Sequence, residues 1–342
     1  MSEILREPVR EPSAWTPGEL AADPSWIYRF SDADIAELDQ ATEGVRAKGA
    51  GNFDREDFPL PNLESLFENI LQQIEFGRGC VLIKGLDVTA YDPATLETLY
   101  WGIAAHLGVL MHQNPMGDLI GHVTDGGRDY ASNNVRGYTT KAELRPHSDP
   151  TDVVALLCKH PSKSGGESCI ASASAIYNEI LATHPEYLEI LTAGFHFDLR
   201  GEGVTTDPNE TSFNRVPAFS YFDGRLSCRF NSRTMIEGMD KAGKSLNEQE
   251  LKAVQYVVEL ALSDKFRHDI IFERGDIQIL NNHGILHARK GFEDFPEPER
   301  KRDLLRLWLN LREGRDLAPE FADRLNTGPR GGICLTDDRR PH

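Results

Sequence analysis

Two residues near the middle of the chain have the types and the spacing of metal ligands. His147 and Asp149 stand in the stretch LRPHSDPTDVV, residues 144–154, just ahead of an apolar run. Because positions i and i+2 of a strand project to the same side, this imidazole and this carboxylate can reach one metal ion. A chance pairing in a turn or a cap is the alternative, so the rest of the chain must supply the missing parts of a site.

A third ligand has to come from a distant part of the chain. The stretch DIQILNNHGILHARKGF, residues 276–292, holds His283 and His287. The tripeptide NHG at 282–284 has the composition of a turn, so we expect His287, on the returning strand, to be the ligand rather than His283. Two histidines and one carboxylate on one face of Fe(II) leave the opposite face open for a co-substrate and O₂, as in non-haem iron oxygenases.

An arginine in an apolar strand adds a fourth part. Arg306 follows His287 by 19 positions and lies in ERKRDLLRLWLNL, residues 299–311. An arginine in such surroundings must either extend to solvent or meet a buried anion. A dicarboxylate co-substrate that chelates the metal with one end would place its other carboxylate here, and a planar guanidinium suits that bidentate contact. The alternative is a surface position at the end of a strand.

The chain resembles the taurine/2,4-dichlorophenoxyacetate dioxygenase family in four stretches, taken in order: HSD at 147–149, SGGESCIAS at 164–172, NNHGILHAR at 281–289 and RDLLRLWLNL at 302–311. This family comprises Fe(II)- and 2-oxoglutarate-dependent oxygenases with a double-stranded β-helix fold of the clavaminate synthase-like type. The resemblance, which extends over residues 62–312, implies that His147, Asp149 and His287 bind iron. It also implies that Arg306 holds the distal carboxylate of 2-oxoglutarate.

Two further residues are candidate contacts for the co-substrate. The family commonly has a threonine after a Gly-Gly-Asp turn, whereas this chain has Gly-Gly-Glu at 165–167 followed by Ser168, which keeps the hydroxyl. Arg302 matches a second basic position of the family. The alternatives are a strand-filling role for Ser168 and a solvated charge run for the RKR at 300–302.

The resemblance implies that 2-oxoglutarate and O₂ are converted to succinate and CO₂ while a substrate beside the metal is oxidised. Halogenases of the superfamily replace the carboxylate ligand by a small residue, but Asp149 is present here. Hydroxylation, or its variants desaturation, ring closure and dealkylation, is therefore the expected outcome. The alternative class is a jelly-roll protein that uses a divalent metal without redox chemistry, such as a zinc hydrolase or a binding module. Arg306 discriminates between them, because a hydrolase has no use for a carboxylate-binding arginine.

Several arginines near the ligands suggest a substrate that bears a carboxylate or another anion, such as an amino acid. The loop NNVRGYTTKAELRPHSD, residues 133–149, precedes the ligands, and the stretch SCRFNSR, residues 227–233, could approach them. The candidate substrate-binding residues are Asn134, Arg136, Tyr138, Arg145 and Arg229, with Asn133 and Arg233 beside them. Surface salt bridges are the alternative for each arginine.

The elements that must position these residues are mostly short strands. Turn-bounded apolar runs predict strands at 80–86, 152–158, 167–173, 225–230, 268–273, 276–282 and 304–311. Helical spacing predicts helices at 31–49 with Ser31 as cap, 61–77 with Asn62 as cap, 92–108, 174–191 and 245–264, and a long loop at 121–140. Many short strands with few intervening helices favour an antiparallel sandwich over a doubly wound sheet.

We therefore predict a mixed α and β fold, with a double-stranded β-helix (jelly-roll) core and flanking helices mainly on its N-terminal side. Residues 1–61 are expected to form an N-terminal arm and helix packed on the core, and residues 62–342 the oxygenase domain, as one structural domain overall.

Composition limits the partners and the compartment. The formal charge of -17 argues against nucleic acid and anionic membranes, which need a basic surface. The chain has no apolar run long enough to span a membrane, and its N-terminus lacks the apolar core of a signal peptide. Five scattered cysteines without a Cys-x-x-Cys pair indicate reduced thiols. A cytoplasmic enzyme with a small-molecule substrate is expected, and a homo-oligomer is left open.

Overall fold

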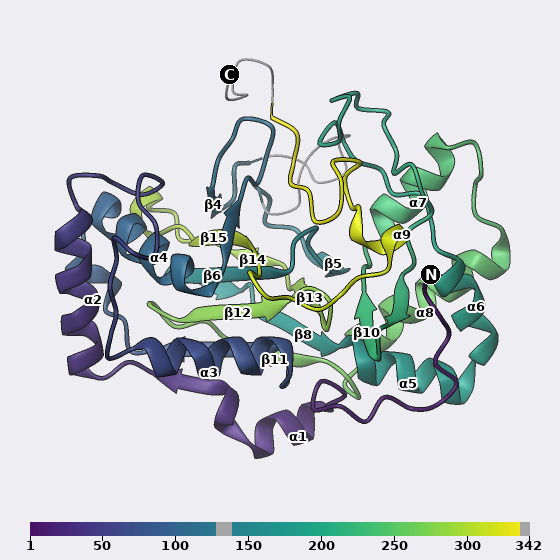
Figure 1. Cartoon of the computed structure of the whole chain (residues 1–342), viewed down its shortest axis with the longest axis horizontal. Coiled ribbons are helices and arrows are strands. Elements are labelled where there is room, and N and C mark those ends of the chain that lie inside the picture. Colours follow the sequence, from purple (N-terminus) through teal and green to yellow (C-terminus); the bar gives the residue numbers. More distant parts are fainter. Residues whose placement is uncertain (128–138, 336–342) are drawn as a thin grey trace.

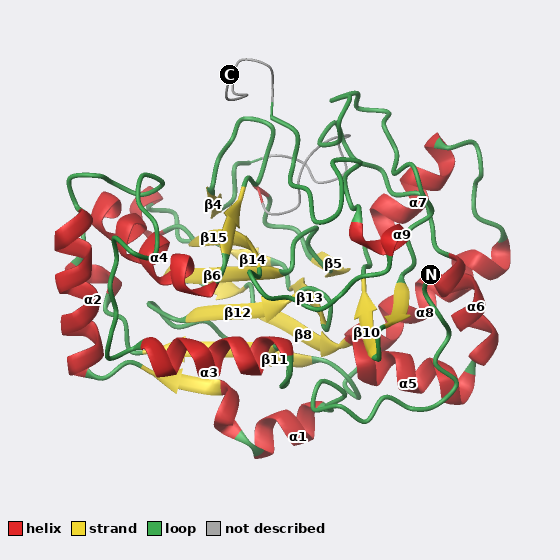
Figure 2. Ribbon diagram, viewed as in Figure 1, coloured by secondary structure: helices red, strands yellow, loops and turns green. Residues whose placement is uncertain are grey.

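Two β-sheets lie at the centre of the structure, with helices outside them (Figure 1; Figure 2). This computed structural model describes residues 1–127 and 139–335. The larger sheet has seven strands, in the order β1 (Ile27–Arg29), β2 (Cys80–Lys84), β12 (Ile277–Asn281), β6 (Val153–His160), β15 (Asp303–Asn310) and β3 (Val109–Met111), with β4 (Ile120–Val123) also paired to β15. Its pairs are antiparallel except β1–β2.

The smaller sheet has four antiparallel strands, in the order β11 (His268–Ile270), β8 (Ser168–Ser172), β13 (Ile285–Arg289) and β5 (Leu144–His147). Two short pairs complete the strands: β9 (Phe219–Phe222) with β10 (Arg225–Cys228), and β7 (Ser164–Gly165) with β14 (Phe292–Glu293). Consecutive strands β12 and β13 lie in different sheets, as in a jelly roll. The predicted mixed fold with a jelly-roll core is confirmed.

The larger sheet is buried on both faces, which explains its nearly continuous apolar strands. In β15, Leu305 and Leu307 pack with the N-terminal helices in one apolar cluster. Leu304 and Trp308 belong to the other cluster, which also includes residues of the smaller sheet. Because strand side chains alternate, Arg306 shares the inner face with Leu304 and Trp308.

Two groups of helices flank the sheets (Figure 1). The first group is α2 (Asp32–Val45), α3 (Glu64–Glu75) and α4 (Pro93–Leu107). The second group is α5 (Ala173–Thr183), α6 (Pro185–Ala193), α7 (Ser232–Lys241) and α8 (Glu248–Leu262), of which only α7 was not predicted as a helix. Because of this group, the flanking helices are not mainly N-terminal, as the sequence had led us to expect. The remaining helical segments are α1 (Pro17–Ala22), α9 (Pro319–Ala322) and the 3₁₀ turns Pro24–Trp26, Val88–Ala90 and Pro298–Arg300. Within the described residues, no helix has the length and apolar character needed to cross a bilayer.

Several element boundaries differ from the sequence prediction for local reasons. Helix α3 begins after Leu63 rather than Asn62, whose backbone N–H donates to the Glu37 carboxylate over 2.9 Å. The predicted helix at 174–191 is two helices, because Pro185 has no N–H to continue the first one. Strand β4 overlaps the start of the predicted loop at 121–140, because β15 supplies its hydrogen-bonding partner.

The N-terminal segment contributes to the inner core. Val9, Trp15, Leu20 and Trp26 are buried in the cluster that includes both sheets. The Trp15 indole N–H also donates to the carbonyl of Arg78 over 2.9 Å. These contacts support the single-domain organisation, which remains a proposal.

Candidate active site

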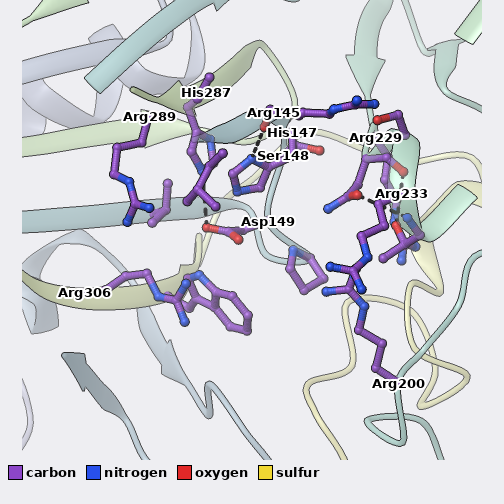
Figure 3. Close-up of a pocket in the computed structure, with 18 of the residues that line it drawn as sticks. Arg145, His147, Ser148, Asp149, Arg200, Arg229, Arg233, His287, Arg289 and Arg306 are labelled. Carbon is purple, nitrogen blue, oxygen red and sulfur yellow. Dashed lines mark hydrogen bonds and ion pairs between the residues drawn. The ribbon is translucent and has the colours of Figure 1, made fainter. Parts of the chain in front are cut away.

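The three predicted metal ligands lie together on the smaller sheet (Figure 3). His147 ends β5, and His287 is its direct cross-strand partner in the middle of β13. Asp149 follows two residues after β5. One ligand atom from each side chain lies within 4.8 Å of the others, and the imidazole centroids are 4.3 Å apart. The chain therefore presents two nitrogen donors and one oxygen donor to one point.

Hydrogen bonds to the backbone orient this group. The His147 Nδ1–H donates to the carbonyl of Arg145 over 2.9 Å, so its Nε2 keeps the lone pair. The backbone N–H of Asp149 donates to Oδ1 of Asn282 over 3.0 Å, which fixes the chain where the carboxylate leaves it. Asn282 lies in the turn between β12 and β13, so this turn supports both the carboxylate and the strand that carries His287.

The electrostatic surroundings favour the protonation states that bind a metal. Burial would raise the pKa of Asp149, but the adjacent His287 and the guanidinium of Arg306 hold that pKa below the ordinary value. Burial and the neighbouring His147 lower the pKa of His287 to about 3. At neutral pH Asp149 is therefore a carboxylate and His287 a neutral imidazole.

The ligand atoms do not satisfy one another. Nε2 of His287 is 3.6 Å from Oδ2 of Asp149, which is too long for a hydrogen bond. Nδ1 of His287 is buried and has no hydrogen-bond partner among the described residues. Two imidazole nitrogens and one carboxylate oxygen that lie this close together without a hydrogen bond between His287 and Asp149 fit a divalent metal ion, and this set of ligand atoms suits Fe(II).

His283, the alternative third ligand, lies outside this group. Its Nε2–H donates to Oδ1 of Asp152 over 2.9 Å, and burial lowers the pKa of His283 to about 4. Asp152 also pairs with the guanidinium groups of Arg324 and Arg330. His283 therefore belongs to a buried polar cluster that connects the β12–β13 turn to the C-terminal segment.

A cavity of about 650 Å³ opens beside the ligands. Its walls come from the inner faces of both sheets, from residues 197–202 and from residues 229–237. It brings together the ligands with the predicted residues Arg145, Ser168, Arg229, Arg233, Arg302 and Arg306. The other candidates for substrate binding, Asn133, Asn134, Arg136 and Tyr138, lie outside the described residues.

Arg306 is held in place by a glutamine that the sequence did not single out. Arg306 is 7% exposed, and the Nε–H of its guanidinium donates to Oε1 of Gln113 over 2.7 Å. Nε2 of Gln113 donates to the carbonyls of Leu119, over 2.7 Å, and Arg306, over 2.5 Å. The guanidinium also stacks 4.6 Å from the Trp308 ring. The sequence around Gln113 does not predict this role, because Gln113 becomes buried only when the strands on either side of it pair with β15.

Arg302 and Ser168 both line the cavity, but their side chains contact different groups. Arg302 is 3% exposed, and burial lowers its pKa to about 10. Its Nη1 donates weakly to the carbonyl of Val123, at 3.4 Å, and no carboxylate of the described residues lies within ion-pair distance. Gly166, in the left-handed region at φ 76°, passes close to it, and a Cβ there would lie 3.3 Å from Nε of Arg302. The Ser168 hydroxyl donates to Oε1 of Gln278 over 2.9 Å.

Comparison with protein families and curated proteins gives consistent matches. Residues 44–308 match the family described as "Taurine catabolism dioxygenase TauD, TfdA family". The chain is 33% identical over 333 residues to FR-33289 synthase of Streptomyces rubellomurinus, covering 96% of each protein. It is 28% identical over 309 residues to the taurine hydroxylase-like protein SAT17 of Stachybotrys chartarum, covering 86% of this chain and 77% of that protein.

Solved structures with the same fold include asparagine oxygenase in complex with Fe(II), (2S,3S)-3-hydroxyasparagine and succinate. Its TM-score is 0.63 at 14% identity, covering 83% of this chain and 93% of the other. The non-haem iron oxygenase OrfP, in complex with Fe, succinate and (3S)-hydroxy-L-Arg, has a TM-score of 0.60 at 13% identity, covering 83% and 94%. At such identities these likenesses concern the fold.

Proposed function

Because the chain belongs to the TauD, TfdA family of Fe(II)- and 2-oxoglutarate-dependent oxygenases, we propose that it oxidises a small, polar, anion-bearing molecule. The expected reaction is hydroxylation, with desaturation, ring closure or dealkylation as its variants, and it consumes 2-oxoglutarate and O₂ to release succinate and CO₂. An amino acid is the simplest substrate of this kind.

The observation that carries this proposal is the convergence of His147, Asp149 and His287 beside a cavity lined with arginines. These three residues would hold Fe(II), through two neutral imidazoles and one carboxylate. When bound, the metal supplies the activation of O₂ with 2-oxoglutarate as the source of two electrons. The protein itself orients 2-oxoglutarate and the primary substrate and excludes water from the buried side of the cavity.

Two arginines that line the cavity, Arg306 in β15 and Arg302 just before it, support the co-substrate assignment. We assign the distal carboxylate of 2-oxoglutarate to Arg306, with Arg302 and Ser168 as further contacts. Arg306 lies near enough to the ligands to affect the pKa values of both Asp149 and His287. Gln113 fixes the orientation of its guanidinium. A buried guanidinium in this position is stabilised by a bound carboxylate.

The substrate assignment rests on the other side of the cavity. Arg145 and Arg229 line it, and we propose that they contact the primary substrate. Asn134, Arg136 and Tyr138 remain candidates from the sequence. The solved neighbours named above hold hydroxylated asparagine and arginine, which supports an amino acid as the first class to test.

The compartment proposed for this enzyme is the cytoplasm. No disulfide joins any of its five cysteines, which supports a reducing environment.

Anaerobic addition of Fe(II) and 2-oxoglutarate tests the proposed function directly. A weak visible charge-transfer band should appear, and succinate should form only when Fe(II), 2-oxoglutarate and O₂ are all present. Zinc should inhibit, because it competes for the same ligands. Turnover with zinc and without 2-oxoglutarate would instead support the non-redox alternative. A screen of small acids for substrate-stimulated succinate formation then identifies the substrate.

A further inference from the structure

Gln278 is a polar side chain in the apolar core between the two sheets. It lies in β12 and is 1% exposed, and its neighbours Ile277 and Ile279 pack with the N-terminal helices. Because strand side chains alternate, Gln278 points to the opposite, inner face, as Leu280 does. A buried amide at such a position lowers stability unless its donors and its acceptor are paired. The presence of this glutamine therefore calls for an explanation.

Only one of the two polar atoms of this amide has a partner. Oε1 of Gln278 accepts a hydrogen bond from the Ser168 hydroxyl over 2.9 Å. Nε2 of Gln278 is buried and makes no hydrogen bond with any residue in the described ranges, 1–127 and 139–335. The amide therefore connects the larger sheet to the smaller one through its acceptor, while its N–H donors are unsatisfied.

Gln278 lies in line with the arginine to which we assign the co-substrate. It is opposite Leu156 of β6, and Leu156 is opposite Arg306 of β15. Gln278 and Arg306 are therefore two strand spacings, or about 10 Å, apart on the inner face of the larger sheet. Leu156, between them, lines the cavity.

Ser168 connects this amide to the cavity. Ser168 lines the cavity, and its cross-strand partner in β13 is Arg289. Figure 3 shows Arg289 and Arg306 on the same side of the metal ligands. The Ser168 hydroxyl therefore lies on the side of the cavity to which we assign the distal carboxylate of 2-oxoglutarate.

The direction of the hydrogen bond between Ser168 and Gln278 does not suit a carboxylate. A hydroxyl has one hydrogen to donate, and here it is directed at Oε1 of Gln278. Ser168 then presents oxygen lone pairs to the cavity, which repel carboxylate oxygens. Rotation of the Gln278 amide by 180° reverses the bond, because Nε2 then donates to Oγ of Ser168. The hydroxyl hydrogen becomes free for a carboxylate, and one N–H donor of the amide gains a partner.

We propose that Gln278 is a positioning residue for 2-oxoglutarate. When the co-substrate binds, the Gln278 amide donates to Oγ of Ser168, and the Ser168 hydroxyl donates to the distal carboxylate. Both hydrogen bonds of this amide–hydroxyl relay point towards the negative charge, so they strengthen one another. The relay rests on the proposed function, and it adds to the co-substrate site a residue that acts only through Ser168.

A double-mutant cycle on the full-length protein tests the relay. The variants are Gln278→Met, which keeps an unbranched side chain but has no amide, Ser168→Ala, and the two combined. Each protein is loaded anaerobically with Fe(II) and titrated with 2-oxoglutarate by calorimetry. The Kd should be about three- to tenfold higher in Gln278→Met and about tenfold or more higher in Ser168→Ala. Gln278→Met should have no further effect in the Ser168→Ala protein, because the hydroxyl through which it acts is absent.

Thermal unfolding of the ligand-free protein separates this role from packing. Gln278→Met removes a buried amide with unpaired donors, and the Ser168 hydroxyl can turn to the cavity, so the Tm should equal or exceed that of the wild type. Leu280→Met, at a buried position on the same face of β12, is the matched control and should leave 2-oxoglutarate affinity unchanged. 2-Oxopentanoate, which lacks the distal carboxylate, should bind equally to the wild type and to Gln278→Met.

Two results would overturn the relay. One is an unchanged Kd for 2-oxoglutarate in Gln278→Met. The other is an equal loss of affinity with and without the Ser168 hydroxyl, which would assign the effect of Gln278 to packing. Failure of the proposed function is recognised separately, because the wild type then binds 2-oxoglutarate without the charge-transfer band while the cycle still decides the relay. A wild type that does not bind 2-oxoglutarate would contradict both.

Discussion

At the scale of single residues, the site depends on a few side chains whose protonation and orientation are set by burial and by backbone contacts. His147 is oriented by the carbonyl of Arg145 and Asp149 by the amide of Asn282. His287 is kept neutral by burial, which lowers its pKa to about 3. His147 and Asp149 are therefore oriented, and His287 is neutral, before any metal binds.

Alanine variants of the proposed ligands should separate metal binding from folding. His147→Ala, Asp149→Ala and His287→Ala should each lose iron retention and turnover, while the far-UV circular dichroism spectrum stays native. His283→Ala should keep iron, because its imidazole pairs with Asp152 instead. It should lose about 1–3 kcal/mol of stability, because Asp152 loses a buried hydrogen bond. Full activity in His287→Ala with loss in His283→Ala would reverse the ligand assignment.

Arg306 in β15 and Arg302 just before it should differ in their effect on 2-oxoglutarate binding. Arg306→Ala would leave a buried carboxylate unpaired, which costs about 2–5 kcal/mol, or roughly 30-fold to several thousand-fold in affinity. Arg306→Lys should recover only part, because an ammonium cannot form two parallel hydrogen bonds. Arg302→Ala should have a smaller effect. Titration of the charge-transfer band measures all three, and a larger loss in Arg302→Ala would move the anchor to that residue.

The buried His283 should make stability depend on pH. Its pKa is lowered by burial to about 4, below the ordinary value of 6.5. Between these two pH values the imidazole takes up a proton in the unfolded chain but not in the folded chain. The free energy of unfolding therefore falls as the pH decreases from about 6.5 towards 4. Urea unfolding of the metal-free protein at several pH values should show this slope. The slope should be smaller in His283→Gln, and equal slopes would contradict the assignment.

At the scale of elements, the smaller sheet carries His147 and His287, with Asp149 just after β5, and β15 of the larger sheet carries Arg306, with Arg302 just before it. Some elements followed from the sequence, such as α2 with its Ser31–Asp34 capping box and α4 with Asp92 as cap. Others did not. Strand β4 and residue Gln113 acquire their structure only from pairing with β15 and Arg306, which lie nearly two hundred positions away.

Gln113 should act as a positioning residue for Arg306. Gln113→Leu removes the acceptor of the Arg306 Nε–H and leaves the guanidinium without its fixed orientation. We expect the Kd for 2-oxoglutarate to rise by about tenfold, with kcat at saturating co-substrate and iron content near wild type. Gln113→Asn keeps an amide, but its side chain is one methylene shorter and does not reach Nε of Arg306. This variant should therefore recover little of the affinity for 2-oxoglutarate. A large loss of kcat at unchanged Kd would point to a different role.

At the scale of the whole molecule, an acidic protein encloses a basic cavity, and its N-terminal segment packs into the same core as both sheets. This packing makes the single-domain proposal testable. Trp15 is 3% exposed and donates to the carbonyl of Arg78.

Trp15→Ala should destabilise the whole protein by about 3–5 kcal/mol, as for other buried aromatic truncations. Thermal unfolding should remain a single transition at a lower Tm. Ser25→Ala, at an exposed position nearby, serves as the control. A second, early transition in Trp15→Ala would instead indicate that the N-terminal segment unfolds on its own.

The sequence by itself determined the jelly-roll class, the ligand residues to consider and the arginine in the apolar strand, because each leaves a local mark. Turn-bounded apolar runs, a His-x-Asp pair and a charged residue among leucines can be recognised without knowing their tertiary partners. Only the tertiary structure brings His287, which the sequence favoured over His283, next to the other two candidate ligands, because the pairing of β13 with β5 is a long-range contact. It also places the Ser168 hydroxyl within 2.9 Å of the Gln278 amide. This hydrogen bond joins two different sheets between segments far apart in the chain, and no local pattern records such a contact.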